Sequence, residues 1–242
     1  MDNIDYSWED GENDKVHIIE NVIDIGNMDS SDTDDLQTRS DMQIMRRVFH
    51  MFTGTSIATL YWLSFSHSQM VHFIGTIACV LYLVEQIRIN YPETAAKLVP
   101  FTKFVMRAEE QLKESAMMPY SMAVLLTIIT FPKDIALVGI YTLAFADPLS
   151  AIIGIKFGKH KISEHRSYEG SAAFFVATFF STFLVLGAFT TGYGFLDIVL
   201  SLLMGILCTG FDLIPLKIDD NLTIPLFTAS SLWILLVIFG LI

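Results

Sequence analysis

The sequence predicts an all-α integral membrane protein of about seven transmembrane helices with its N-terminus in the cytoplasm. Of its 242 residues, 52% are hydrophobic and only 17% are charged, and the mean hydropathy is +0.51. Soluble domains are rarely this apolar. Apolar runs of about the 20 residues that a helix needs to cross the hydrocarbon core recur along the chain. Lys and Arg gather in alternate connections between these runs, as they do in short cytoplasmic loops.

Residues 1–41 are predicted to form a disordered acidic tail ahead of a polytopic membrane domain, residues 42–242. The tail holds 13 acidic and 2 basic residues and the remainder holds 13 of each, so the net charge of −11 lies in the tail (2 − 13 = −11). Such a segment buries too little apolar surface to offset its ordering entropy. Its run Ser30-Ser31-Asp32-Thr33-Asp34-Asp35 makes an acid-directed protein kinase a candidate partner, against the simpler reading of a solubilising tail. The membrane domain is neutral, and no nucleic-acid partner is expected.

The predicted spans cover residues 48–66, 70–89, 117–132, 134–155, 171–190, 193–213 and 222–242. With the N-terminus inside, 14 of the 15 Lys and Arg residues lie on the cytoplasmic side and only Lys133 lies outside. The third run is short, and a re-entrant segment there would invert everything downstream, but the charge distribution favours seven full crossings. Residues 92–115 mix apolar and charged side chains, so we expect an amphipathic helix in the membrane interface.

Asp147 lies inside the fourth predicted span and is followed by Pro148. An ionisable side chain at such a depth costs about 2.5–3.5 kcal/mol on insertion scales, so a functional role is the leading interpretation. The alternative is a structural Asp paired to a neighbouring helix. The proline frees a backbone carbonyl one turn earlier and loosens the helix locally.

Two further charged groups lie at the ends of the first two spans. Arg46, Arg47 and His50 stand at the start of the first, where the arginines could equally anchor the helix to lipid headgroups or bind a phosphate. Glu85 and Arg88 end the second span, three residues apart on one helix face, and are expected to pair. Glu85 is also deep enough to face a polar cavity.

The loop between the fourth and fifth spans combines glycines with cations. Its candidate nucleotide-binding residues are Gly154, Lys156, Gly158, Lys159, Arg166, Glu169 and Gly170. Glycine lets backbone approach a ligand closely, while the cations and the following helix start attract a polyphosphate. The loop does not match the Gly-x-x-x-x-Gly-Lys-Ser/Thr phosphate loop, and Gly154 with Gly158 could instead be a helix-packing pair.

Asp219, Asp220 and Asn221 lie between the sixth and seventh spans. Two carboxylates beside an amide are the oxygen ligands that Mg²⁺, or another divalent cation, takes together with nucleotide phosphates. Capping of the following helix would explain one of the three residues but not all of them. Asn221 is therefore also a candidate nucleotide-binding residue.

These residues resemble motifs of the polyprenol and diacylglycerol kinase family, which includes dolichol kinase, phytol kinase and fungal-type CTP-dependent diacylglycerol kinase. The motifs, spread over residues 46–226, are Arg46-Arg47-Val48-Phe49-His50, Glu85-x-x-Arg88, Ala146-Asp147-x6-Gly154-x-x-x-Gly158, Ser167-x-Glu169-Gly170-Ser171 and Asp219-Asp220-Asn221-Leu222-Thr223. Within this family the chain is most similar to the fungal-type enzyme, because it is short and has an acidic N-terminal arm. Arg47 and Arg166 stand where the family usually or often has Lys, which keeps the charge but changes its shape.

The resemblance implies a kinase that transfers the γ-phosphoryl group of CTP to a membrane lipid at the cytosolic face, most simply from diacylglycerol to phosphatidate. It implies that Arg46, Arg47, Asp147 and Gly154 are needed for activity. Asp219 or Asp220 would hold Mg²⁺, and Asp147 would either join them or orient the lipid hydroxyl. Arg46, Arg47, Lys156 and Lys159 would bind the triphosphate. The host membrane implied is the endoplasmic reticulum or nuclear envelope, with a bacterial inner membrane as the alternative.

Three other functions stay open from the sequence. The first is a dolichol- or phytol-type polyprenol kinase, which differs only in the lipid alcohol. The second is a phosphatidate cytidylyltransferase-like enzyme, although its Gly-x-Lys-Asp motif with a distant Asp is absent. The third is an ion-coupled transporter with Asp147 as the coupling residue, which the grouping of polar motifs on one face disfavours.

Overall fold

The computed structural model describes residues 30–91, 117–163, 166–189, 193–216 and 218–242. The chain divides into two compact units, Met1–Arg46 and Arg47–Ile242. The second unit holds the apolar part of the first helix and every later element. Its description excludes the side chains of Arg88 and Met117.

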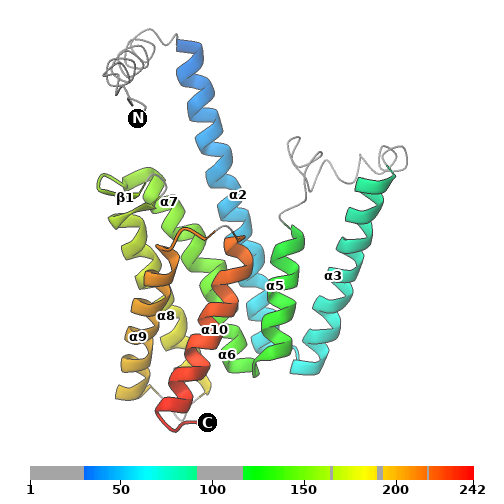
Figure 1. Ribbon diagram of the computed structural model, residues 1–242, viewed down its shortest axis with the longest axis vertical. Coiled ribbons are helices and arrows are strands. Elements are labelled where there is room, and N and C mark those ends of the chain that lie inside the picture. The colour runs from blue at the N-terminus through cyan, green and yellow to red at the C-terminus, as the bar shows by residue number, and fades with distance from the viewer. Residues whose placement is uncertain (1–29, 92–116, 164–165, 190–192, 217) are drawn as a thin grey trace, which may run out of the picture. The chain divides into compact units, whose positions relative to one another are not determined.

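The described residues form seven helical rods and one short hairpin (Figure 1). The rods are α2 (Ser30–Leu63), α3 (His67–Asn90), α5 (Met117–Thr130), the continuous run of α6 (Lys133–Tyr141), the π-helix η2 (Thr142–Ala146) and α7 (Asp147–Phe157), α8 (Tyr168–Phe189), α9 (Phe195–Asp212) and α10 (Asp220–Ile238). Between α7 and α8, β1 (Lys161–Ser163) pairs antiparallel with β2 (Arg166–Ser167). The prediction of an all-α membrane protein is confirmed.

Five of the rods are long and apolar enough to cross a membrane: α3, the α6–α7 rod, α8, α9 and α10. The α5 helix has only 14 residues, or about 21 Å at 1.5 Å per residue, which is shorter than the roughly 30 Å hydrocarbon core. In α2 only the part after His50 is free of charged residues. The count of seven crossings and their orientation therefore stay predictions.

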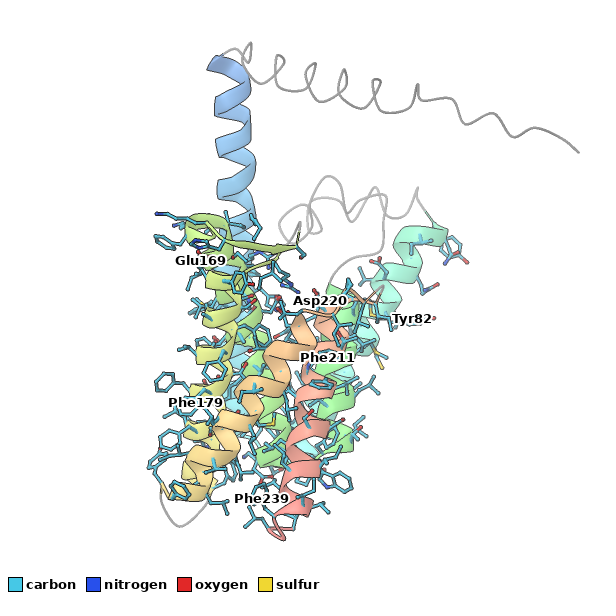
Figure 2. The ribbon with its side chains drawn as sticks, turned by 60° about the vertical axis from the view of Figure 1, so that its left-hand side comes forward. Tyr82, Glu169, Phe179, Phe211, Asp220 and Phe239 are labelled. Atoms are coloured by element: carbon cyan, nitrogen blue, oxygen red, sulfur yellow. The ribbon has the colours of Figure 1, made fainter. Side chains whose placement is uncertain are left out.

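The direction of the rods alternates along the chain (Figure 1). The α7 and α9 helices end, and α8 and α10 begin, at one end of the bundle, which we call the polar end. Figure 2 shows Glu169 and Asp220 at this end and Phe239 at the other. The polar end is therefore built by connections that the charge distribution assigns to the cytoplasmic side.

The α6–α7 rod forms the centre of the bundle. Its apolar window is 72% buried, against 22–39% for the other four long helices, whose exposed apolar faces suit contact with lipid. It packs against α8 and α10, and α10 also packs against α5 and α9. At the crossing with α10, a Cβ on Gly139 would lie 2.7 Å from the carbonyl oxygen of Pro225, so only glycine permits this approach.

The basic residue that the topology prediction leaves outside, Lys133, has a structural role. Its Nζ donates hydrogen bonds of 3.0 and 2.8 Å to the carbonyl oxygens of Trp62 and Phe65, and it lies 5.2 Å from the ring centroid of Tyr61. These carbonyls are at the end of α2, where a cation also complements the helix dipole. Lys133 thus ties α2 to the start of the central rod.

We expect Lys133→Met to lower the free energy of unfolding by about 2 kcal/mol, because a hydrogen bond to a charged group contributes roughly 1.5–3 kcal/mol to stability. Thermal unfolding in detergent measures the change. Lys161→Met, an exposed position on β1, is the matched control and should leave the midpoint in place. Equal midpoints for the two variants would contradict this role of Lys133.

One boundary differs from the prediction. The α2 helix begins at Ser30, so residues 30–41 are helical where we expected a tail without fold. The physical reason is that Asp32, Asp34 and Asp35 lie in its first turns, where negative charge is favourable against the helix dipole. Residues 1–29 and the predicted amphipathic helix of residues 92–115 lie outside the described residues.

Candidate active site

Asp147 lies at the junction where the central rod changes geometry. The π-helix Thr142–Ala146 ends directly before it and α7 starts with it. Pro148 has no N–H to donate to the preceding turn, which accounts for the local widening of the helix. The side chain of Asp147 is 16% exposed and therefore sits at the edge of the buried core.

Arg47 of α2 reaches Asp147. Its Nη1 lies 3.8 Å from Asp147 Oδ2, and its Nε is buried without a hydrogen bond to any described residue. Two turns along the same face of α2, Gly54 packs against η2, where a Cβ would lie 2.8 Å from the Cβ of Ala144 and 2.6 Å from the hydroxyl of Tyr120. The glycine lets α2 approach the rod closely, and this approach brings Arg47 to the carboxylate.

Arg166 of β2 connects two other helices. Its Nη2 lies 2.8 Å from Asp212 Oδ1, at the end of α9, and 3.3 Å from Asp220 Oδ2, at the start of α10. The contact with Asp220 has the geometry of a hydrogen bond. The guanidinium group of Arg166, which belongs to the hairpin, thus bridges the end of α9 and the start of α10.

The two ion-pair groups form one site. Asp212 interacts electrostatically with Arg166, Asp147 and Asp220. Asp220 in turn interacts with Arg166, Asp147, Asp219 and Arg47. Arg47, Asp147, Arg166, Asp212 and Asp220, which come from five different elements, are called the charged site below. Three carboxylates face two guanidinium groups there, so the site keeps a net negative charge that a further cation would offset.

Asp212 is the residue that the sequence analysis missed. Its side chain is 2% exposed, and neither of its carboxylate oxygens accepts a hydrogen bond within the described part of the chain. The signal was available, since Asp212 is an ionisable residue closing an apolar run, the same feature that singled out Asp147.

The structure gives the other predicted metal ligands different surroundings. Asp219 is the N-cap of α10, and its Oδ1 accepts a hydrogen bond of 2.8 Å from the backbone N–H of Asn221. Asp220 is half-exposed and pairs with Arg166. No group of three or more Asp, Glu, His or Cys side chains in the described part is arranged to hold a metal ion.

The residues fit Mg²⁺ in its usual mode with nucleotides, which uses one or two carboxylates and completes its shell with phosphate oxygens and water. Asp212 and Asp220 are two such carboxylates, brought within reach of one nitrogen atom. An all-protein metal cage is not what this arrangement offers.

The predicted nucleotide-binding glycines lie where α7 crosses α8. A Cβ on Gly170 would lie 2.8 Å from the carbonyl oxygen of Ser150, and one on Gly158 would lie 2.7 Å from the hydroxyl of Ser167. A Cβ on Gly154 would be 3.3 Å from the same hydroxyl. Gly154 and Gly170 therefore permit the close approach of α7 and α8, and Gly158 permits the close approach of β2, the strand that carries Arg166.

The remaining polar residues of this loop fall into two kinds. Glu169 accepts a hydrogen bond of 2.8 Å from His160 Nδ1 and others from the backbone N–H of His160, which closes the turn after α7. Lys156 and Lys159 are exposed, and their side chains have no hydrogen bond or ion pair within the described residues. They are available to an anion arriving from water.

The structure describes the two other predicted groups only in part. His50 packs edge-on against Tyr120, with ring centroids 4.5 Å apart. Glu85 is buried on α3, whose main packing partner is α5. The side chains of Arg46 and Arg88 lie outside what the structure describes.

These features define a helical membrane protein with a charged site at one end of its bundle. The protein named CTP-dependent diacylglycerol kinase 1 in Saccharomyces cerevisiae is 26% identical over 208 residues, which cover 77% of this chain and 71% of the relative. The protein of that name in Schizosaccharomyces pombe is 24% identical over 206 residues, covering 80% of this chain and 94% of the relative. Phytol kinase of Synechocystis is 30% identical over 101 residues, covering 40% and 43%.

No family model matches the chain, and no solved structure does. The names of these relatives nevertheless agree with the resemblance read from the sequence motifs. The chain is similar to CTP-dependent diacylglycerol kinases and to phytol kinases, which are lipid kinases by name.

Proposed function

We propose that this protein is a CTP-dependent kinase that phosphorylates diacylglycerol to phosphatidate at the cytosolic face of its membrane. The observation that carries the proposal is the charged site, in which Asp147, Asp212 and Asp220 lie with Arg47 and Arg166 at the polar end of an apolar bundle. A water-soluble triphosphate and a lipid hydroxyl can meet only near such a boundary. The names of the fungal relatives supply the nucleotide and the lipid.

Phosphoryl transfer depends mostly on positioning and on neutralising phosphate charge. Arg47 and Arg166 provide guanidinium groups that can contact phosphate oxygens. Asp147 orients the lipid hydroxyl and takes its proton as the hydroxyl oxygen bonds to the γ-phosphorus. The bond between this phosphorus and the β-phosphate oxygen breaks, and CDP leaves. A divalent cation held by the carboxylates would neutralise charge on the phosphates when bound.

The exposed Lys156 and Lys159 fit a steering role for the incoming nucleotide. We expect the double variant Lys156→Ser/Lys159→Ser to raise KM for CTP about threefold to tenfold with little change in kcat. The effect should shrink at high ionic strength, because salt screens exposed charges. Initial rates at 0.05 and 0.5 M salt check this, and a KM that does not respond to either change would contradict it.

A direct assay tests the proposed function. The purified protein in lipid–detergent micelles is supplied with γ-labelled CTP or ATP and with diacylglycerol, dolichol or phytol, and the products are separated by chromatography. Label in phosphatidate, with CTP preferred, is the expected result. Label in phytyl or dolichyl phosphate would instead favour a polyprenol kinase, which the similarity to phytol kinase makes the second candidate. Release of pyrophosphate rather than CDP would indicate a cytidylyltransferase, and ligand flux without turnover a transporter.

Three finer points go with the proposal. The host membrane is the endoplasmic reticulum or nuclear envelope, by analogy with the family. Phosphorylation of the acidic tail by a protein kinase would act on Ser30, Ser31 or Thr33, whose side chains the structure does not describe. Mg²⁺ is the divalent cation expected with CTP.

A further inference from the structure

Asp212 is an unusual carboxylate for the position it holds. It closes α9, is 2% exposed and accepts no hydrogen bond on either oxygen from the described residues. A buried carboxylate without hydrogen bonds is costly unless a cation compensates for it. Its compensating group is Arg166 Nη2 at 2.8 Å, in a contact that is an ion pair without hydrogen-bond geometry. The surroundings of Asp212 therefore favour a positive charge, and they do not require one particular hydrogen-bond donor.

Arg166 occupies a place between two carboxylates. The same Nη2 atom lies 2.8 Å from Asp212 Oδ1 and 3.3 Å from Asp220 Oδ2, so one positive atom bridges the end of α9 and the start of α10. The side chain comes from a two-residue strand and is 24% exposed. A metal ion bridging two carboxylates occupies the same kind of position.

The neighbouring carboxylates are committed elsewhere. The Oδ1 atom of Asp219 caps α10 through the N–H of Asn221 at 2.8 Å. Asp147 lies on a separate helix and has Arg47 as its guanidinium partner at 3.8 Å. Asp212 and Asp220 remain as the pair that one cation can join.

We propose that Asp212 and Asp220 form the divalent-cation subsite of the charged site, and that Arg166 fills this subsite as an internal counter-ion which the cation displaces. The inference rests on the proposed function, because the cation in question is the one that accompanies the nucleotide. It moves the metal-binding role predicted for Asp219 to Asp212. It also gives Arg166 two partners in turn, the carboxylates before the cation arrives and phosphate oxygens afterwards.

The test measures Mn²⁺ binding to the purified full-length protein in detergent, without nucleotide or lipid, from the electron paramagnetic resonance signal of free Mn²⁺. Asp212→Asn should weaken Mn²⁺ binding about tenfold or more. Even the loss of a side chain that only orients a metal ligand weakens metal binding by about 10–100-fold in other proteins. Arg166→Gln should strengthen binding, because it removes the competitor. Asp219→Asn keeps a capping side chain and should bind Mn²⁺ as the wild type does.

Thermal unfolding of each variant separates misfolding from lost binding. If Asp212→Asn unfolds early, Asp220→Asn at its half-exposed position replaces it and should also weaken binding. Wild-type affinity in both carboxylate variants, weaker binding in Arg166→Gln, or no binding by the wild type would overturn the inference. The Mn²⁺ measurement uses no substrate. If the variants bind Mn²⁺ as expected here but the wild type shows no kinase activity in the separate assay, the proposed function alone is contradicted.

Discussion

Replacing Asp147 by Asn is expected to reduce transfer of label from γ-labelled CTP to lipid by at least about 10²-fold, the usual contribution of a positioned acid or base. Asn has nearly the same shape but cannot take the hydroxyl proton, and it removes the charge that faces Arg47 at 3.8 Å. The residue lies at the edge of the core, so the bundle should fold as before. Product formation and the thermal midpoint are measured on the same preparation.

The matched control is Asp134→Asn, which changes the same functional group at the opposite end of the same rod. It should keep nearly wild-type activity. Undiminished turnover by Asp147→Asn would remove the central residue of the proposed mechanism.

The sequence was a good guide to the rods because lipid imposes a strong constraint on them. Apolar runs mark the crossing segments, and the predicted span 134–155 corresponds to the observed rod Lys133–Phe157. Two connections that charge placement groups together, between α7 and α8 and between α9 and α10, lie at one end of the bundle, while the orientation of that end in the membrane stays a prediction. The disagreement at residues 30–41 arose because a charged helix carries no hydrophobic signal, so α2 extends where composition indicated no fold.

The composition of the charged site was harder to predict, because it depends on contacts between distant segments. Asp147 stood out as a charge within an apolar run, but nothing local links Arg166 to Asp212, 46 positions later (212 − 166 = 46). Asp219 and Asp220 are adjacent and chemically identical, yet one caps a helix and the other faces Arg166. Which of them turns inward depends on the backbone at the start of α10, and a pattern of residue types does not specify that.

The roles of the glycines in the loop after α7 were also not determined by residue type alone. A Gly-rich loop beside cations predicted direct contact between backbone and nucleotide, while the structure gives Gly154, Gly158 and Gly170 tight packing contacts among α7, β2 and α8. Both roles require a missing Cβ, so the sequence alone cannot separate them. In the packing role these residues act on the site indirectly, since β2 and Arg166 lie immediately before α8.

Gly170→Ala tests this indirect role and is expected to lower kinase activity about 10²-fold, the loss that a displacement of roughly 1 Å can cause. The new Cβ would lie 2.8 Å from the carbonyl oxygen of Ser150 and 3.4 Å from the Cα of Gly154. Both are backbone atoms that cannot rotate away, so the first turn of α8 must move and take Arg166 with it. Overpacking of this kind also costs about 1–3 kcal/mol of stability.

Gly210→Ala is the matched control, because the same substitution on α9 meets nothing within 4 Å. It should keep full activity and gain up to about 1 kcal/mol from the higher helix propensity of alanine. Thermal unfolding and initial rates are compared for the two variants in the same detergent. If Gly170→Ala is as active as Gly210→Ala, then the α7–α8 crossing does not position Arg166, and the hairpin must be held by its own contacts.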